Sequence, residues 1–244
     1  MISLFNTILF QPLFNALVFL YNSIPGHDLG LAIIVLTALV KLALFPLSYQ
    51  SIKSQRALQE LQPKLNALKK QYGKDREALA KETMKLYKAE KVNPLSSCLP
   101  LLVQLPFLIA IYQVFITGLH ADSLRWLYPF VVNPGVLNPL SFGLLDLSKA
   151  NIALAVLTGA AQYWQTKMLA TARPPKATPG SKDEDMAAIM NRQMQIMMPA
   201  MTVIIGISLP SGLVLYWLVT TLLTIAQQYV MFKPSRPSVD VPAA

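Results

Sequence analysis

The residue with the most unusual chemistry in this sequence is Lys41, because it lies inside a long apolar run. The run from Leu29 to Leu47 has no other charged side chain and is long enough to cross a bilayer. An ionisable group at such a depth costs roughly 2.5–3.5 kcal/mol on insertion scales. Two explanations are open. Either the side chain extends past Leu47 to water, about 9 Å away along the helix, or the protein builds a hydrated site around it.

Uncharged polar residues in the other apolar runs could share such a site with Lys41. They are Thr37, Gln104, Gln113, Gln162, Thr220, Thr221 and Gln227. Each also fits a more ordinary explanation, a hydrogen bond between neighbouring helices. The apolar runs contain almost no Asp or Glu, which disfavours a proton relay or a cation pathway, since those normally use carboxylates.

Enzymatic and metal chemistry find little support in the sequence. There is no nucleophile–base pair, phosphate-binding loop or cluster of metal ligands, and His27 and His120 stand apart from other ligand types. Cys98 is the one cysteine, so it cannot form an internal disulfide. We therefore expect a protein that is not an enzyme and that uses no metal or cofactor.

Composition and apolar periodicity predict an all-α integral membrane protein. The chain is 54% hydrophobic and 14% charged, against about 25% charged in soluble domains, and its mean hydropathy is +0.44. We predict a core over 27–232 with a bundle of five spans, followed by a short tail over 233–244. The spans are placed at about 29–47, 99–119, 152–168, 195–209 and 213–232.

Residues 1–26 carry no charged side chain, and polar residues recur about every fourth position from Ser3 to Asn15. This pattern favours an amphipathic helix in the membrane interface, because a polar stripe would be costly against lipid. The segment is also long enough to be a span.

A basic segment over 49–93 interrupts the apolar pattern. It contains eleven Lys/Arg and five acidic residues, and leucines recur at helical spacing from Leu58 to Leu68. Gly73 and the candidate N-cap Asp75 separate two helices, and Pro63 should interrupt the first of them. We predict an antiparallel helical hairpin outside the membrane.

The distribution of positive charge predicts the topology. Eighteen of the 21 Lys/Arg lie in the hairpin, in the loop over 167–192 or in the C-terminal tail. Only Arg125 and Lys149 lie in loops on the opposite side. The positive-inside rule therefore places the hairpin and the C-terminus in the cytoplasm.

Several sequence blocks resemble the YidC/Oxa-type membrane protein insertases. The first is Gln59-Glu60-Leu61-Gln62-Pro63-Lys64-Leu65. It is followed by Asn93-Pro94-Leu95 and by Cys-Leu-Pro-Leu-Leu-Val-Gln-Leu-Pro over 98–106. The last blocks are Gly-Leu-Val-Leu-Tyr-Trp over 212–217 and Gln227-Gln228-Tyr229. The blocks occur in the same order as in that family, and the similarity extends from about Gly30 to Tyr229.

The resemblance implies an insertase and chaperone of the short form, without a large periplasmic domain, in a bacterial-type plasma (inner) membrane. Its bundle would hold a hydrophilic groove open to the cytoplasm and to lipid. The implied groove residues are Lys41, Thr37, Gln104, Gln162 and Trp217. The implied hairpin residues that capture substrates or partners are Pro63, Lys64, Tyr72 and Arg76. Nascent membrane proteins and lipids are the expected partners, the ribosome and a Sec-type translocon are candidate partners, and no nucleic acid is expected.

This sequence departs from the family pattern at three places. Lys41 stands where the family usually has arginine, which keeps a positive charge but removes the planar fork of donors. Ser96-Ser97 replaces a usual Gly-Gly, and Thr221 replaces a common asparagine.

Two other functions remain as alternatives: a small transporter or channel with Lys41 as an anion site, and a scaffold whose spans only anchor the hairpin.

Overall fold

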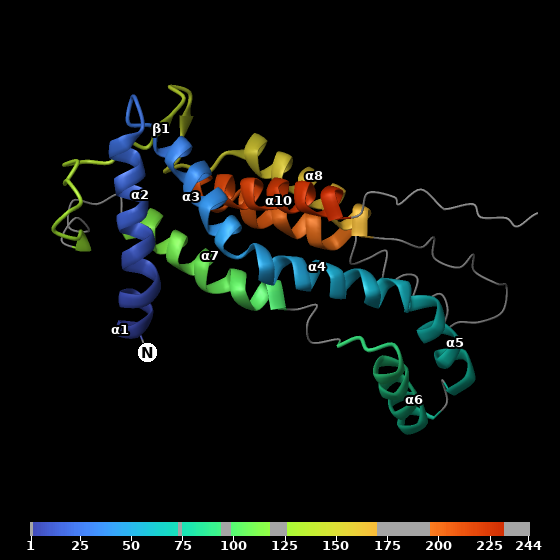
Figure 1. The fold of residues 1–244 in the computed structure, drawn as a ribbon. Helices are drawn as coiled ribbons and strands as arrows, with labels where there is room; N and C mark the ends of the chain where they lie inside the picture. The colour runs from blue at the N-terminus through green and yellow to red at the C-terminus, as the bar shows by residue number, and fades with distance from the viewer. Residues whose placement is uncertain (1, 73–74, 94–98, 118–125, 170–195, 232–244) are drawn as a thin grey trace, which may run out of the picture.

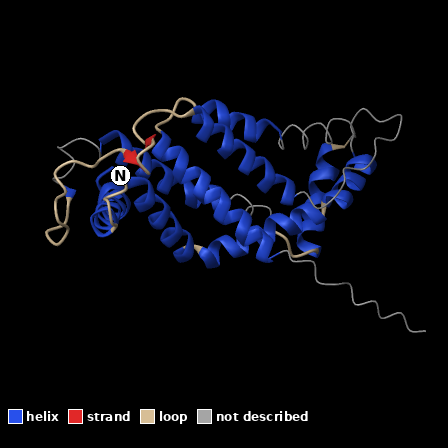
Figure 2. Ribbon diagram, turned by 90° about the horizontal axis from the view of Figure 1, so that it is seen from above, coloured by secondary structure: helices blue, strands red, loops and turns tan. Residues whose placement is uncertain are grey.

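The computed structural model describes residues 2–72, 75–93, 99–117, 126–169 and 196–231 (Figure 1). These residues are mainly helical, which confirms the predicted all-α class, apart from two strands of two residues each. In the figures, the helices form an elongated bundle from which α5 and α6 project at one end (Figures 1 and 2). The predicted tail lies outside the described residues, as do positions 118–119, 195 and 232 at the ends of the predicted second, fourth and fifth spans.

The N-terminal segment is one continuous helical run of α1 (Ile2–Phe5), the π-helix η1 (Asn6–Phe10) and α2 (Gln11–Ser23). The run lies across one end of the bundle, since α2 is upright beside α3 in Figure 1 and nearly end-on in Figure 2. One face, including Phe14 and Val18, is buried in the core, while Leu4 and Ile8 are exposed. The crosswise orientation agrees with a helix in the membrane interface, and its position relative to lipid stays a prediction.

The polar stripe of α2 binds the loop that follows α7. Asn15 is buried, donates from Nδ2 to the carbonyl of Trp126 at 3.0 Å, and accepts from the Tyr128 N–H at 2.6 Å. Asn22 donates to the carbonyl of Val132 at 2.7 Å. The stripe therefore satisfies backbone groups of a loop more than a hundred residues away in sequence.

Helix α3 (Leu29–Ala43) begins at the N-cap Asp28, whose Oδ1 accepts from the Leu31 N–H at 2.9 Å. It ends earlier than the predicted span, because the chain bends by 72° at Leu44 before α4 (Phe45–Glu60). Pro46 lies in the first turn of α4, where its missing N–H is tolerated, and it cannot donate to the Leu42 carbonyl to continue α3. Lys41 is therefore in the last turn before the bend.

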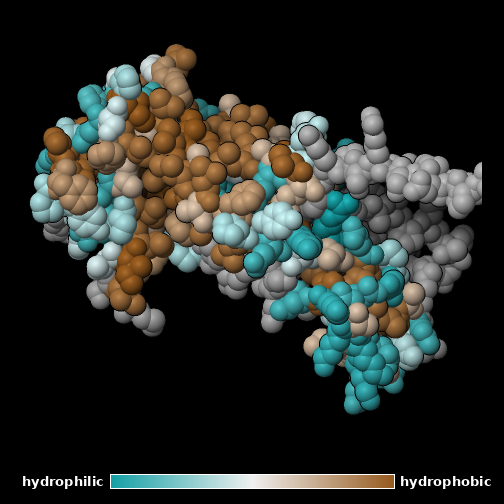
Figure 3. Space-filling view, in the orientation of Figure 1, coloured by the Kyte–Doolittle hydropathy of each residue, from teal (hydrophilic) through white to brown (hydrophobic). Residues whose placement is uncertain are grey.

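The basic segment forms α4, α5 (Gln62–Tyr72) and α6 (Arg76–Ala89). The first helical arm breaks at Leu61, two residues before Pro63, and Asp75 caps α6 by accepting from the N–H groups of Glu77 and Ala78. The ion pair between Lys64, near the start of α5, and Glu90, just after α6, shows that these two helices are antiparallel. Much of their surface is hydrophilic, with one hydrophobic patch, in contrast to the largely hydrophobic bundle (Figure 3).

The bundle is centred on α10 (Ser211–Met231), which packs against α3, α7 (Leu99–Thr117) and α8 (Ile152–Leu169). A further helix, Ile196–Gly206, lies close to α8: a Cβ built at Gly159 would be 2.4 Å from Val203 Cγ2. In the described part of the chain, α10 alone is long and apolar enough to cross a membrane, and the bent pair α3–α4 passes if taken as one span. The count of five spans stays a prediction.

A loop over 126–149 closes the end of the bundle where α3 and α10 begin. It contains an antiparallel hairpin of β1 (Leu140–Ser141) and β2 (Leu145–Asp146). Leu147 is buried in the core, and its carbonyl accepts from the Gly212 N–H at 3.0 Å. The loop is thereby fastened to the start of α10.

Candidate functional site

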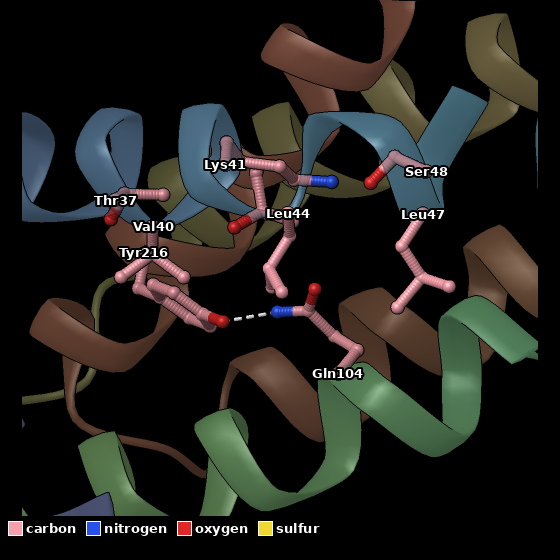
Figure 4. Close-up of a pocket in the computed structure, with 9 residues that line it drawn as sticks. Thr37, Val40, Lys41, Leu44, Leu47, Ser48, Gln104 and Tyr216 are labelled. Atoms are coloured by element: carbon pink, nitrogen blue, oxygen red, sulfur yellow. Dashed lines mark hydrogen bonds between the residues drawn. The ribbon is translucent and has the colours of Figure 1, made fainter.

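A pocket lies inside the bend between α3 and α4 (Figure 4). It has about 30 Å³ of space that water can occupy, and it is open to the surroundings. Figure 4 shows α3–α4 on one side and Gln104 of α7 with Tyr216 of α10 on the other. The lining residues are Thr37, Val40, Lys41, Leu44, Leu47, Ser48, Gln104, Tyr216 and Thr220.

Lys41 contributes the charge of this pocket. Its Nζ donates a 2.9 Å hydrogen bond to Thr224 Oγ1, and the Thr224 hydroxyl donates to the Thr220 carbonyl at 2.7 Å. Because the hydroxyl proton is used within α10, Thr224 presents a lone pair to the ammonium. An ammonium has three donors, and Thr224 occupies one of them. None of the described carboxylates forms an ion pair with Lys41.

Gln104 and Thr37 line the pocket together with Lys41, but their hydrogen bonds differ. Gln104 Nε2 donates to the Tyr216 hydroxyl across α7 and α10. Thr37 is buried, and its hydroxyl donates to the Ile33 carbonyl within α3 at 2.6 Å. Thr37 therefore offers the pocket only acceptor lone pairs, whereas Gln104 can still offer its amide oxygen and the second N–H of its amide group.

Gln162 and Trp217 are not among the residues that line this pocket. Gln162 Oε1 accepts from the Thr202 hydroxyl and joins α8 to the helix Ile196–Gly206. Trp217 is partly buried, and its carbonyl accepts from the Thr221 hydroxyl at 2.9 Å. The structure thus brings together three of the five predicted groove residues.

Tyr216, Thr224 and Ser48 were missed as site residues. Tyr216 and Trp217 are neighbours in the sequence, but they point about 100° apart on a helix with 3.6 residues per turn. Thr220 and Thr224 are four residues apart and so share a face of α10. That spacing was the available signal, but it does not reveal which helix the face meets.

The predicted capture residues lie at the ends of α5 and α6. Pro63 and Lys64 are exposed in the first turn of α5, and Lys64 pairs with Glu90. Tyr72 ends α5, and its hydroxyl accepts from Gln71 Nε2 at 3.2 Å. Arg76 begins α6, and its side chain lies outside the described residues.

Charged groups outside the bundle form local pairs. Lys149 Nζ lies 2.8 Å from Asp146 Oδ2, and this hydrogen bond lowers the pKa of Asp146 to about 2 and raises that of Lys149. A hydrogen bond to Glu82 raises the pKa of Lys85. Over the described residues, His, Cys, Asp and Glu form no group of three or more that could hold a metal ion.

Comparison with known proteins decides the family. A family model described as "60Kd inner membrane protein" matches residues 19–237. The chain belongs to this family. The resemblance to YidC/Oxa-type insertases, seen in the sequence blocks, is thereby confirmed.

The relatives carry the name membrane protein insertase YidC. The chain is 37% identical over 225 residues to that of Syntrophus aciditrophicus, an alignment covering 91% of this chain and 36% of the relative. It is 36% identical over 226 residues to that of Magnetococcus marinus (91% and 35%). It is 38% identical over 226 residues to that of Cellvibrio japonicus, and this alignment covers 91% of this chain and 35% of the relative. The chain spans about a third of the length of these relatives.

Proposed function

We propose that this protein is a non-enzymatic membrane protein insertase and chaperone, with the pocket around Lys41 as part of its hydrophilic groove. The observation that carries the proposal is a lysine inside an apolar bundle whose ammonium has one hydroxyl partner, no carboxylate partner among the described residues, and an open pocket in front of it. The family supports it, since relatives that cover most of this chain are named insertases.

The physical role of such a groove is to reduce a desolvation cost. A membrane protein's polar flank must cross hydrocarbon, where unpaired polar groups cost several kcal/mol each. A hydrated pocket partway along the path replaces lipid with water and with donors such as Lys41 and Gln104. Two charges 4 Å apart attract by about 4 kcal/mol at an effective dielectric constant of 20. Lys41 can therefore hold an acidic flank transiently while the apolar segment moves toward lipid.

A second surface suits the exit of the apolar segment. Met197, Met198 and Met201 are exposed on the helix Ile196–Gly206, beside Ile204 and Ile205. Methionine side chains adapt to differently shaped partners. We propose that this face, together with lipid, accommodates emerging segments. The methionines at 186, 190 and 194 continue the spacing in the sequence but lie outside the described residues.

The proposal includes the predicted topology of five spans with the α5–α6 hairpin in the cytoplasm. Exposed charge on α5 and α6, including the Lys64–Glu90 pair, agrees with a position in water. Nascent membrane proteins are the proposed substrates, and the hairpin ends at Pro63, Lys64, Tyr72 and Arg76 are proposed to contact them. The ribosome and a Sec-type translocon are proposed as further partners of this region.

The test is insertion of a single-span substrate with an acidic flank into vesicles that contain the purified protein. Lys41→Arg should keep insertion, whereas Lys41→Leu should weaken it. Lys53→Leu is the matched control, because it removes an exposed charge on α4 outside the pocket. Equal insertion by wild type and Lys41→Leu would refute the role of the groove charge. Photocrosslinking of a stalled nascent chain from Gln104 would show whether substrate enters the pocket, and crosslinking from Trp217, which does not line it, would show whether substrate contacts another face of α10.

A further inference from the structure

The tip of the β1–β2 hairpin exposes large apolar side chains. Leu144 is 91% exposed and Phe142 is 61% exposed, between the two short strands. Figure 3 shows hydrophobic surface at this tip, above the start of α3. A water-exposed turn normally carries Gly, Asn, Asp or Ser, so the choice of residues here indicates a surface that another phase or molecule covers.

The β1–β2 hairpin is fixed to the start of α3 by hydrogen bonds and by close packing. Ser141 Oγ donates to Asp28 Oδ1 at 2.7 Å, and the Phe142 N–H donates to Asp28 Oδ2. Asp28 is also the N-cap of α3. A Cβ built at Gly30 would be 2.0 Å from Ser141 Oγ, so only glycine allows the strand to approach the helix this closely. The tip therefore moves together with the first turn of α3.

The turn itself places a phenylalanine in an unfavourable conformation. Phe142 has φ +52° and Gly143 has φ +69°, both in the left-handed region. Glycine and asparagine adopt this region readily, but a bulky residue does so at an energetic cost. The two hydrogen bonds to Asp28 hold the turn in this state. The chain thus keeps a large apolar side chain at a position where a small or polar one would be more stable in water.

The surroundings of the tip favour lipid as its partner. The α1–α2 run lies across the same end of the bundle and exposes Leu4 and Ile8 (Figures 1 and 2). Helix α8 starts only six residues after β2 and exposes Ile152 and Val156, one turn apart on the same face. The exposed apolar residues of the tip and of the first turns of α8 therefore lie close together in sequence, on either side of the charged pair Asp146–Lys149.

We propose that the tip Phe142–Leu144 inserts into the headgroup–acyl boundary of the adjacent leaflet. It would act as a second interfacial anchor beside α1–α2 and, through Asp28, would hold the start of α3 at a fixed depth. Apolar and aromatic residues at this boundary are the usual means by which interfacial segments bind a bilayer. The proposal is independent of the groove, because it uses none of the residues that line the pocket.

The test uses a single fluorescent label on the full chain. Leu144→Cys in a Cys98→Ser background is labelled with an environment-sensitive dye and reconstituted into phosphatidylcholine–phosphatidylglycerol vesicles. The same lipids with bromine near the top of their acyl chains serve as quencher. We expect blue-shifted emission and loss of most of the fluorescence with the brominated lipid. The matched control is Ala89→Cys, an exposed position at the end of α6, which should be much less quenched.

Three results would overturn the proposal. Blue-shifted emission without quenching would mean that protein, either a second copy or another part of the chain, covers the tip. Emission typical of water would mean that nothing covers it. Equal quenching at both label positions would remove the distinction on which the proposal depends. Phe142→Asn, which suits the same turn, should reduce the quenching at 144, and unchanged quenching would exclude Phe142 from the anchor.

Discussion

Replacing Thr224 with valine tests whether the position of the Lys41 ammonium matters for insertion. Valine has nearly the same shape as threonine but no acceptor, so the 2.9 Å hydrogen bond from Nζ is lost. The internal bond from the Thr224 hydroxyl to the Thr220 carbonyl is lost with it. The ammonium keeps its charge but is no longer held against α10.

The magnitude follows from the kind of bond that is removed. A hydrogen bond to a charged group contributes about 1.5–3 kcal/mol when no other partner replaces it. Lys41 is only partly buried and faces an open pocket, so water can take over part of this interaction. We therefore expect a loss of about 1 kcal/mol, which corresponds to roughly fivefold in rate or affinity.

The assay compares two substrates that differ only in their flank, one acidic and one neutral. Thr224→Val should slow insertion of the acidic substrate about fivefold and leave the neutral one nearly unchanged, since only the acidic flank uses the charge. Thr224→Ser keeps the hydroxyl and should resemble wild type. Thr221→Val is the control, because its hydroxyl bonds the Trp217 carbonyl instead of Lys41. If the ratio of acidic to neutral insertion is the same in Thr224→Val and wild type, the positioning role of Thr224 is refuted.

Three further predictions concern the end of the bundle opposite α5 and α6. Gly30→Ala should lower the free energy of unfolding by about 1–3 kcal/mol, because the new Cβ would overlap Ser141, and Ser141→Gly should restore part of it in a thermal melt. Burial tends to raise the pKa of Asp28, but hydrogen bonds from Phe142, Leu31, Ser141 and Gly30 leave it below its ordinary value of 3.8. A lowered folded-state pKa means that this carboxylate stabilises the fold above about pH 3.8 and that the contribution is lost as pH falls through the lower value. Asp28→Asn should therefore flatten the acid side of the stability curve, and an unchanged curve would contradict this reasoning. Asn15→Ala should cost about 1–3 kcal/mol, because it leaves the partly buried Tyr128 N–H without its acceptor, and the Trp126 emission should shift in the same variant.

Local signals in the sequence were sufficient for many of the helix ends. Asp75 was recognised as an N-cap from its place before a helical pattern, and it bonds the N–H groups of Glu77 and Ala78. Pro63 marked the break between α4 and α5, because proline lacks the donor that a helix interior needs. Lys41 stood out because an isolated charge in an apolar run is rare. These features depend on neighbours a few residues away, so the sequence contains the information directly.

Tertiary contacts decided which partners the polar residues of the helices have. The polar stripe of α2 suggested only an amphipathic helix, yet Asn15 binds the loop at Trp126 and Tyr128. The family motifs grouped Lys41 with Gln104, Gln162 and Trp217. The rotation of each helix places Gln104 in the pocket, joins Gln162 to Thr202 and leaves Trp217 outside the pocket lining.

The sequence by itself determined that a charge lies in an apolar helix, that the chain is mainly helical, and that it resembles a family of insertases. It did not determine that α3 ends two residues after Lys41, or that Thr224 and Tyr216 face the bend. The physical reason is that hydropathy and helix period describe one segment at a time. The position of an ammonium among its acceptors depends on how α3, α7 and α10 rotate and pack against one another, and that is a property of the folded bundle.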